Sequence, residues 1–197
     1  MSTIQINVPN WLDKICAWPV MVYRKHKYGY TFRRIYLDEG QWTIVDSGDY
    51  YALKRFKWII HGTGNNIYAV RNKIIGPNKT KMVYMQREIM NPPAGIVIDH
   101  RNCESLDNRR SNLRPATRAE NALNRRKKKN GTAQYRGVWL VKKCGKWAGQ
   151  VEYKGKRIWL GYFDSEIEAA KAYDEAAKKL HGEFARLNFP EPQITQK

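Results

Sequence analysis

The chain has 197 residues, and its 36 Lys and Arg outnumber its 18 Asp and Glu, which gives a formal net charge of +18. Because 42% of the residues are hydrophobic and 12% are aromatic, the chain can bury apolar cores, and a disordered basic tail is excluded. The charge, together with a sequence pI of ≈ 9.9, predicts a polyanionic partner, with nucleic acid as the first candidate.

The cysteines and the hydropathy restrict the class of protein further. Cys16, Cys103 and Cys144 lie far apart and form no C-x-x-C pair, so neither a zinc knuckle nor a disulfide framework is predicted. No segment has the apolar length of a signal peptide or a membrane span, and no basic amphipathic helix with a large apolar face favours a membrane surface. We therefore expect a soluble protein of a reducing, intracellular compartment.

Residues 1–34 are predicted to form a basic and aromatic N-terminal arm. Apolar residues between positions 11 and 22 predict a short helix or strand. From Arg24 to Arg34, the run RKHKYGYTFRR interleaves cationic and aromatic side chains, which suits a groove that follows a nucleic-acid backbone. A solvated basic loop explains the same run equally well.

Residues 35–95 predict an α+β platform. The segments 35–37 and 42–45 are expected to pair as a hairpin, and Asp46 and Ser47 offer an N-cap to a helix that runs through Phe56. A short strand at 67–70, a turn at 76–78 and a strand-to-helix segment at 81–90 follow.

The next stretch, 96–126, gathers polar side chains on a strand, a loop and a helix. An apolar strand at 96–98 is followed at once by Asp99 and His100. After a polar run, Thr117 and Glu120 match the T-x-x-E capping box, so a helix that carries Asn121 is predicted to begin near residue 118.

These residue types suit metal-assisted cleavage of a phosphodiester. The Asp99 carboxylate and the Asn121 amide oxygen are hard ligands of the kind that magnesium or manganese prefers. His100 can act as a general base, because the pKa of an imidazole lies near neutral pH. Asn112 is a candidate to hold the loop or the tautomer of His100.

The order and spacing of His100, Asn112 and Asn121, with Asp99 directly before the histidine, resemble the HNH family of nucleases, in the variant whose last metal-ligating His is Asn. The resemblance implies that Asp99 and Asn121 hold one Mg²⁺ or Mn²⁺ ion, that His100 is the catalytic base and that Asn112 orients it. The platform resembles a phage and bacterial HNH subfamily, which usually has His where this chain has Gln86. Two further candidate site residues, Asn108 and Arg114, have no assigned role.

A cationic run separates this part from the C-terminal part. Residues 125–129 are all Arg or Lys and are followed by Asn130 and Gly131, which predicts a linker at 127–134 that lies along phosphates or is simply solvated.

The C-terminal part predicts a three-stranded antiparallel sheet packed on one helix. Strands are expected at 135–141, 146–153 and 156–163, and Ser165 and Glu168 match a second capping box. Apolar residues then recur at helical spacing from Ala169 to Leu180, so the helix covers one face of the sheet. Its other face carries cationic, amide and aromatic side chains.

The runs YRGVW, GKWAGQV, RIWLGYF, EAAKAYDEAAKKLHG and LNFP resemble the plant ethylene-response-factor (AP-two) DNA-binding domain. That resemblance implies a sheet in the major groove of DNA, in contact through Arg136, Gly137, Trp139, Lys146, Gln150, Glu152, Arg157 and Trp159. Trp139 and Glu152 replace family arginines and Gln150 replaces a common Glu, so the GC-rich target of the plant domains does not carry over.

Taken together, these patterns predict an α+β protein: a ββα-metal, HNH-like nuclease domain at 35–126, followed after the linker by the DNA-binding domain at 135–190 and a tail at 191–197. The predicted function is an HNH homing endonuclease, hydrolysing duplex DNA as a monomer in the cytoplasm of a bacterial or phage-infected cell. The alternative is a catalytically degenerate DNA-binding protein, disabled at Gln86. An RNA-binding protein has only the charge and the aromatic residues in its favour.

Overall fold

The computed structural model describes residues 9–38, 40–64, 66–124 and 133–190. The chain forms two compact units, Met1–Pro115 and Ala116–Lys197. Most of the predicted linker at 127–134 and the whole predicted tail at 191–197 lie outside the described residues. The structure thus divides the chain ahead of the predicted linker, and the domain bounds taken from the sequence stay a prediction.

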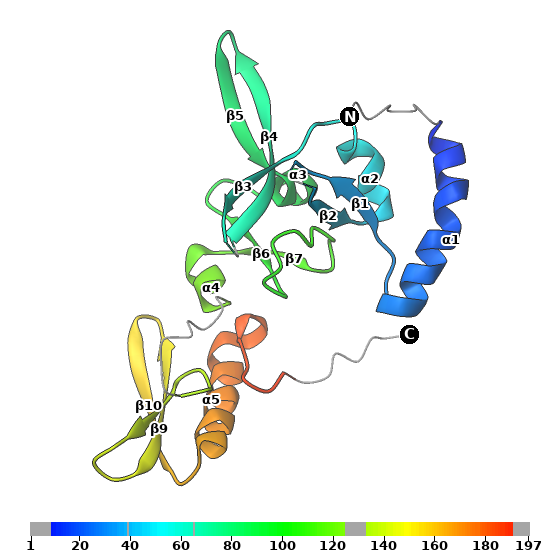
Figure 1. Cartoon of the computed structure of the whole chain (residues 1–197). Helices are drawn as coiled ribbons and strands as arrows, with labels where there is room; N and C mark the ends of the chain where they lie inside the picture. The colour runs from blue at the N-terminus through cyan, green and yellow to red at the C-terminus, as the bar shows by residue number, and fades with distance from the viewer. Residues whose placement is uncertain (1–8, 39, 65, 125–132, 191–197) are drawn as a thin grey trace. The chain divides into compact units, whose positions relative to one another are not determined.

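The described part of the first unit is built from one long helix, two short helices and three small sheets (Figure 1). In chain order its elements are α1 (Asn10–Tyr28), β1 (Arg33–Tyr36), β2 (Trp42–Val45), α2 (Ser47–Leu53), β3 (Ile59–Thr63), β4 (Asn66–Gly76), β5 (Lys79–Tyr84), α3 (Met85–Met90), β6 (Val97–His100) and β7 (Leu113–Ala116). β1 pairs with β2, β3–β4–β5 form an antiparallel sheet, and β6 pairs with β7.

The platform elements predicted from the sequence are present, with two differences. The hairpin is β1 and β2, and the helix after Asp46 is α2, which ends at Leu53 rather than Phe56. The strand expected at 67–70 is instead an 11-residue strand, β4. Its outer half has no regular apolar alternation in the sequence; it is a strand because β5 supplies backbone hydrogen bonds to it.

The N-terminal arm contains one long helix. α1 has 19 residues, and the N–H of Gly29, at φ 80, donates to the carbonyl of Lys25 and ends it. An ion pair of 2.9 Å between Asp13 of α1 and Arg33 of β1 attaches the helix to the platform. The sequence left helix and strand open at this point, and the structure selects the helix.

One apolar cluster joins the platform to the strand that carries Asp99 and His100. Trp58 lies at its centre, 2% exposed, and donates its indole N–H to the carbonyl of Leu53 at 2.9 Å. Burial of each large side chain stabilises the fold by about 1.5–3 kcal/mol. The cluster consists of Ile35, Val45, Leu53, Trp58, Ala69, Met85, Ile89, Ile98 and Leu113.

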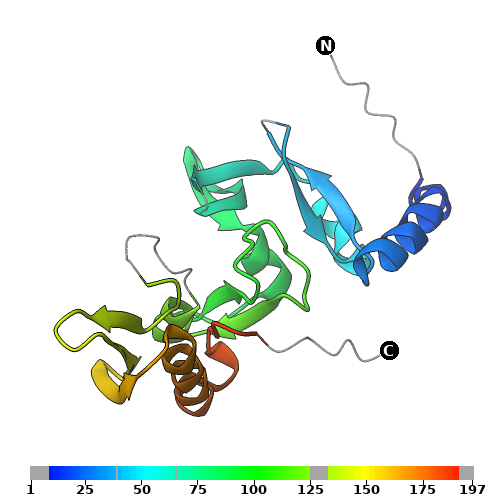
Figure 2. The ribbon, with the colours of Figure 1, turned by 60° about the horizontal axis from the view of Figure 1, so that its bottom comes forward.

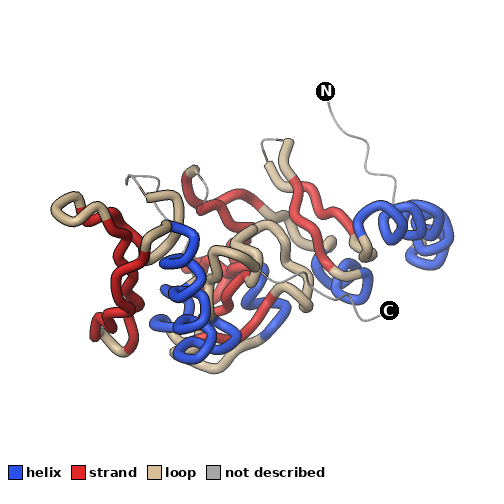
Figure 3. Tube along the Cα trace, turned by 90° about the horizontal axis from the view of Figure 1, so that it is seen from below, coloured by secondary structure: helices blue, strands red, loops and turns tan. Residues whose placement is uncertain are grey.

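The second unit contains an antiparallel sheet of order β10–β9–β8 with α5 along one face (Figures 2 and 3). The three predicted strands and the long helix are confirmed. β8 begins at Val138 rather than at residue 135, because Gly137 has a positive φ that interrupts an extended strand. The elements are α4 (Arg118–Leu123), β8 (Val138–Val141), β9 (Lys146–Tyr153), β10 (Lys156–Phe163), α5 (Glu166–His181) and a 3-10 turn, η1 (Gly182–Phe184).

Small side chains let α5 lie close to this sheet. Ala169, Ala170 and Ala177 of α5 are fully buried, and Val138 and Val151 pack against them from the strands. The α+β class and the antiparallel sheet under one helix are therefore confirmed, whereas an HNH-like ββα-metal nuclease fold is not shown.

Gly137 is the tightest point of this packing, and its substitution tests it. A Cβ there would lie 2.2 Å from the ring of Tyr173 and 2.6 Å from the carbonyl oxygen of Gln150, at φ +72. We expect Gly137→Ala to lower the free energy of unfolding of the second unit by about 2–4 kcal/mol, through both strain and overlap.

The matched control is Gly155→Ala, which has a similar φ of +74 but nothing within 4 Å of the new Cβ. It should cost only about 1 kcal/mol. Hydrogen exchange of the β9 amides in increasing urea measures the free energy of unfolding of both variants. Equal losses in the two variants would show that the Tyr173 contact is not the constraint.

Candidate nucleic-acid interface

Asp99, the predicted metal ligand at the end of β6, is engaged by an arginine of the neighbouring strand. Its Oδ2 atom accepts from Nε of Arg114 at 2.8 Å and lies 2.6 Å from a terminal guanidinium nitrogen. Both side chains are 5% exposed. Because the site is buried, the charge of a carboxylate is tolerated there only beside a cationic partner such as this guanidinium. Arg114, which carried no role in the sequence, is thus the partner of Asp99.

His100, the predicted base, lies in a buried chain of hydrogen bonds. Its Nε2 is 3.2 Å from the side-chain oxygen of Asn108. The Asn108 amide donates to the hydroxyl of Thr43 at 2.9 Å, and that hydroxyl donates to the carbonyl of Leu106 at 2.7 Å. Because the oxygen of Asn108 accepts, Nε2 carries the proton in the neutral ring.

The environment keeps His100 neutral. Burial lowers the pKa of His100 below its ordinary value of 6.5, although the Asn108 hydrogen bond and the charges of Asp99 and Asp107 oppose this shift. The hydrogen bond from Nε2–H to Asn108 fixes the orientation of this neutral imidazole ring. Asn108 therefore positions His100, which the sequence left unassigned.

Asn112 holds the backbone of the loop between β6 and β7. Its amide group donates to the carbonyl of Asp107 at 2.8 Å, and its side-chain oxygen accepts from the N–H of Asn102 at 3.0 Å. The structure thus places Asn112 on the loop rather than on the imidazole ring, and its assignment as a catalytic residue stays a prediction.

Sequence reasoning missed a second buried ion pair in the same loop. Arg109 binds Asp107 through two contacts of 2.8 and 2.6 Å, and its guanidinium lies 3.4 Å from the ring centroid of Tyr30. The -D-x-R- spacing was the one local signal, because the ring of Tyr30 comes from a distant segment. The pair ties the loop to the N-terminal arm.

The residues assigned to a magnesium or manganese site do not fit one. The carboxylate of Asp99 is occupied by Arg114, and no group of three or more His, Cys, Asp or Glu that could hold a metal ion occurs within the described parts of the chain. Asn121 lies on α4, in the second unit. The predicted metal cofactor is therefore corrected.

Gln86, which stands where the nuclease subfamily usually has His, is 6% exposed on α3. Its side-chain oxygen is buried without a hydrogen-bond partner within the described residues. A buried acceptor left in this way costs about 1–3 kcal/mol. The position contributes no partner to the His100 chain described above.

The free face of the β8–β10 sheet carries a row of exposed aromatic side chains. The rings of Trp139 and Trp159 meet edge to face at 5.7 Å, and Trp159 meets Tyr162 in the same way at 5.0 Å. Gln150 stands opposite Trp159 in the β9–β10 register, next to the buried Val151 of the helix-covered face. Trp159 is 49% and Tyr162 58% exposed.

Charged side chains border these rings. Arg157 and Glu152 face each other across β9 and β10. Lys146 is 3.1 Å from Asp164, but the two side chains are 53% and 83% exposed, so water weakens that attraction to a fraction of a kcal/mol. Lys146 therefore stays available to an anionic partner.

Arg136 and Gly137, predicted to contact DNA, lie on the side of α5. Gly137 abuts Tyr173 of that helix. Burial raises the pKa of Tyr173, and the nearby Arg136 opposes the shift. The backbone of Arg136 is held by Asn188, whose side-chain oxygen accepts the N–H of Arg136 at 2.6 Å. The backbone N–H of Asn188 in turn donates to the carboxylate of Asp174 at 2.8 Å.

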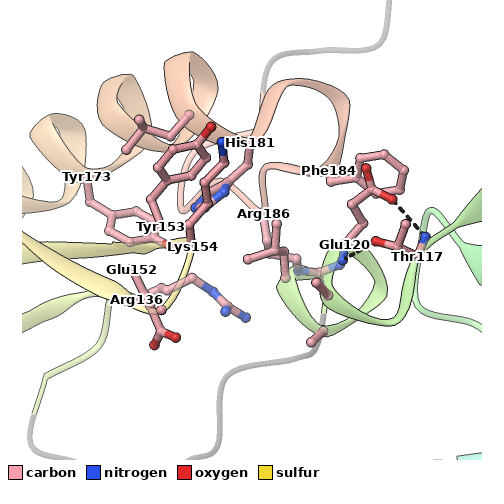
Figure 4. Close-up of a pocket in the computed structure, with 15 residues that line it drawn as sticks. Thr117, Glu120, Arg136, Glu152, Tyr153, Lys154, Tyr173, His181, Phe184 and Arg186 are labelled. Atoms are coloured by element: carbon pink, nitrogen blue, oxygen red, sulfur yellow. Dashed lines mark hydrogen bonds between the residues drawn. The ribbon is translucent and has the colours of Figure 1, made fainter.

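A pocket of ≈ 690 Å³ in the second unit is lined in part by Arg136, Glu152, Tyr173 and His181 (Figure 4). The first turn of α4 borders it, where Thr117 and Glu120 exchange the two hydrogen bonds of the predicted capping box. Glu152 thus lies at the rim shared by this pocket and the sheet.

Comparison with known proteins assigns the second unit. A model of the AP2 domain matches residues 133–183, and a model of the HNH endonuclease family matches residues 90–123. The chain is 52% identical over 64 residues to dehydration-responsive element-binding protein 2C of Arabidopsis thaliana, a match that covers 32% of this chain and 18% of that protein.

Two further Arabidopsis proteins match over the same length. Dehydration-responsive element-binding protein 2D is 47% identical over 64 residues, which cover 32% of this chain and 31% of that protein. The AP2-like ethylene-responsive transcription factor TOE2 is 42% identical over 65 residues, which cover 33% of this chain and 13% of that protein. The chain thus spans less than a third of the length of each of these relatives.

These findings confirm the predicted AP2 domain and the predicted resemblance of residues 90–123 to the HNH endonuclease family, and they correct the predicted function. AP2 domains bind double-stranded DNA. The relatives are named as element-binding proteins and a transcription factor of plants, which overturns the homing endonuclease, its hydrolase activity and its bacterial or phage-infected cytoplasm. None of the described helices has the length and hydropathy to cross a bilayer. A monomeric state on DNA stays a prediction.

The Asp99–Arg114 pair can be tested by truncation. Arg114→Ala leaves a buried carboxylate without its partner, so we expect the free energy of unfolding of the first unit to fall by about 3–5 kcal/mol. The control is Arg110→Ala, because Arg110 pairs with Asp49 but is 55% exposed and should cost less than about 1 kcal/mol. Urea unfolding measures the loss of free energy of unfolding in both variants. Similar losses would mean that Asp99 has another source of stabilisation.

The neutral state of His100 predicts a pH dependence. The unfolded chain binds a proton at His100 near pH 6.5, whereas burial lowers the folded pKa. The unfolded state therefore binds more protons below that pH, and the first unit should lose up to about 1.4 kcal/mol per pH unit as the pH falls through that window.

His100→Gln keeps a donor for Asn108 and should flatten this dependence between pH 7.5 and 5.5, measured by hydrogen exchange in the first unit. His181, whose pKa is also lowered by burial, lies in the second unit, so His181→Gln is the matched control. A slope unchanged by His100→Gln would show that this ring is not the titrating group.

Proposed function

We propose that the chain is a double-stranded DNA-binding protein that recognises a specific site through its C-terminal sheet and acts in the regulation of transcription. The AP2 domain match at 133–183 carries the proposal. The names of the relatives, a responsive-element-binding protein and a transcription factor, support the regulatory role. The paired carboxylate of Asp99 supports binding without cleavage.

The shape of the sheet suits the major groove. α5 closes one face, and the other face stays open with Trp139, Gln150, Arg157 and Trp159 on it. The major groove is about 12 Å wide and admits strands whose side chains reach the edges of the bases. The same groove distinguishes all four base pairs, so this face can supply sequence recognition.

The side chains on this face specify the bases that we propose it reads. Gln150 offers the paired donor and acceptor that match adenine, and the adjacent ring of Trp159 offers an apolar surface to the methyl group of thymine. Arg157 and Glu152, opposite each other in register, match the guanine acceptors and the cytosine amino group. We therefore propose a site that contains an A·T pair next to a G·C pair.

The charge of the chain supplies affinity that does not depend on sequence. A net charge of +18 favours contact with phosphates, and each such contact makes the binding more sensitive to salt. The run of Arg and Lys at 125–129 adds to this charge in the sequence, although it lies outside the described residues.

Selection of duplexes from a random pool, followed by fluorescence anisotropy on the selected site, tests the proposal. Gln150→Ala should weaken binding by about 1–3 kcal/mol and remove the discrimination against replacement of the adenine. Gln41→Ala, at an exposed position of the first unit, is the control and should leave both unchanged.

The same preparation, incubated with supercoiled plasmid and Mg²⁺ or Mn²⁺, should bind without nicking. A relaxed product that disappears with a chelator would overturn the assignment as a binding protein. Failure to select any duplex would overturn sequence recognition by the sheet.

A further inference from the structure

The outer halves of β4 and β5 form a two-stranded ribbon that no other strand accompanies. β3 pairs with β4 only as far as Val70, whereas β5 pairs with β4 up to the turn between Gly76 and Lys79. We call residues 71–83 the hairpin arm. In Figure 1 this ribbon projects beyond the rest of its sheet.

One face of the hairpin arm carries unneutralised positive charge. Lys73 and Lys81 stand directly opposite each other in the register, and both are exposed. Like charges in this arrangement repel and destabilise a strand pair. Lys79 at the turn adds a third charge, and residues 71–83 contain no Asp or Glu. Such a pair of lysines is stabilised when an anion lies across both.

The opposite face and the tip of the hairpin arm expose apolar side chains. Ile74, opposite Thr80, is 80% exposed, and Met82, opposite Asn72, is 40% exposed. A register shift between Ile74 and Gly76 leaves Ile75 unpaired and 58% exposed. Apolar side chains in water at the end of a ribbon indicate a surface that is covered in a complex.

The base of the hairpin arm is anchored, so its direction is fixed by the platform. Arg71 is 8% exposed and binds both carboxylate oxygens of Glu88 on α3, at 3.0 and 2.9 Å. Its guanidinium also lies 3.9 Å from the ring centroid of Phe56. This arginine is therefore used by the fold, and the lysines further out are the ones available to a ligand.

We propose that the hairpin arm is a second DNA-contacting site, in which Lys73 and Lys81 bind backbone phosphates and Ile74 and Ile75 make apolar contacts inside the groove. A two-stranded ribbon fits the major groove, where apolar side chains contact the methyl group of thymine. The inference rests on the proposed DNA-binding function but adds a contact far outside the AP2 match at 133–183. The pattern favours duplex DNA over an acidic protein, because a narrow ribbon with lysines on one face and isoleucines on the opposite face and tip offers charge to phosphates and apolar side chains to bases.

The experiment compares variants of the full chain on the selected duplex, extended by flanking DNA on both sides. Lys73→Ala/Lys81→Ala should lower the slope of log K against log salt by about 2, since each phosphate contact contributes about 0.9. Ile74→Ala/Ile75→Ala should weaken binding about tenfold at an unchanged slope. Both variants should shorten the nuclease footprint on one side while the preference for the selected sequence is kept.

The control is Lys57→Ala/Lys171→Ala, which removes the same charge from exposed positions elsewhere and should leave the footprint at full length. Thermal melting checks folding: loss of the lysine pair should not lower the melting temperature, because the two charges repel. A full-length footprint and an unchanged salt slope in both arm variants, with Gln150→Ala still impaired, would overturn this inference alone. Absence of duplex binding by the parent chain would overturn the proposed function and this inference together.

Discussion

The ion pair between Asp99 and Arg114 joins β6 to β7 in the buried interior of the first unit, with both side chains 5% exposed. Removing two charges from water costs several kcal/mol for each ion, which only close, well-directed contacts repay. The pair therefore fixes the register of the two strands and with it the loop between them. That loop is further held by Asn112 and by the Asp107–Arg109 pair, so its polar side chains are used in contacts within the fold.

These contacts between polar side chains determine the role of the cluster around Asp99 and His100. A carboxylate bound to a guanidinium and a neutral imidazole that donates to Asn108 are a rigid support, whose stability falls when a partner is removed. Side chains that are accessible to a partner lie instead on the uncovered face of the β8–β10 sheet, where aromatic rings and Gln150 are exposed or half-exposed. The match of residues 133–183 to the AP2 domain agrees with this division.

The distribution of charge supports the proposal that both units bind one polyanionic partner. A chain with a net charge of +18 repels itself, and the opposed Lys73 and Lys81 show that repulsion at a single strand pair. In the DNA complex that we propose, phosphates would relieve this repulsion. Sequence recognition by the sheet and salt-dependent attachment by the hairpin arm would then be separate contributions to one affinity.

The sequence by itself determined the elements whose signals are local: the Thr117–Glu120 capping box, the three strands of the second unit and the helix after Ser165, because caps and periodicity act within a few residues. It also identified the AP2 domain. Tertiary structure alone decided the partners of the polar residues. The sequence around Asp99 is equally compatible with a metal ion and with Arg114 as the positive partner of the carboxylate. Asn108 binds Thr43, which is 65 residues away in the sequence. Long-range pairing of this kind leaves no local pattern, since a side chain's chemistry does not state which neighbour satisfies it.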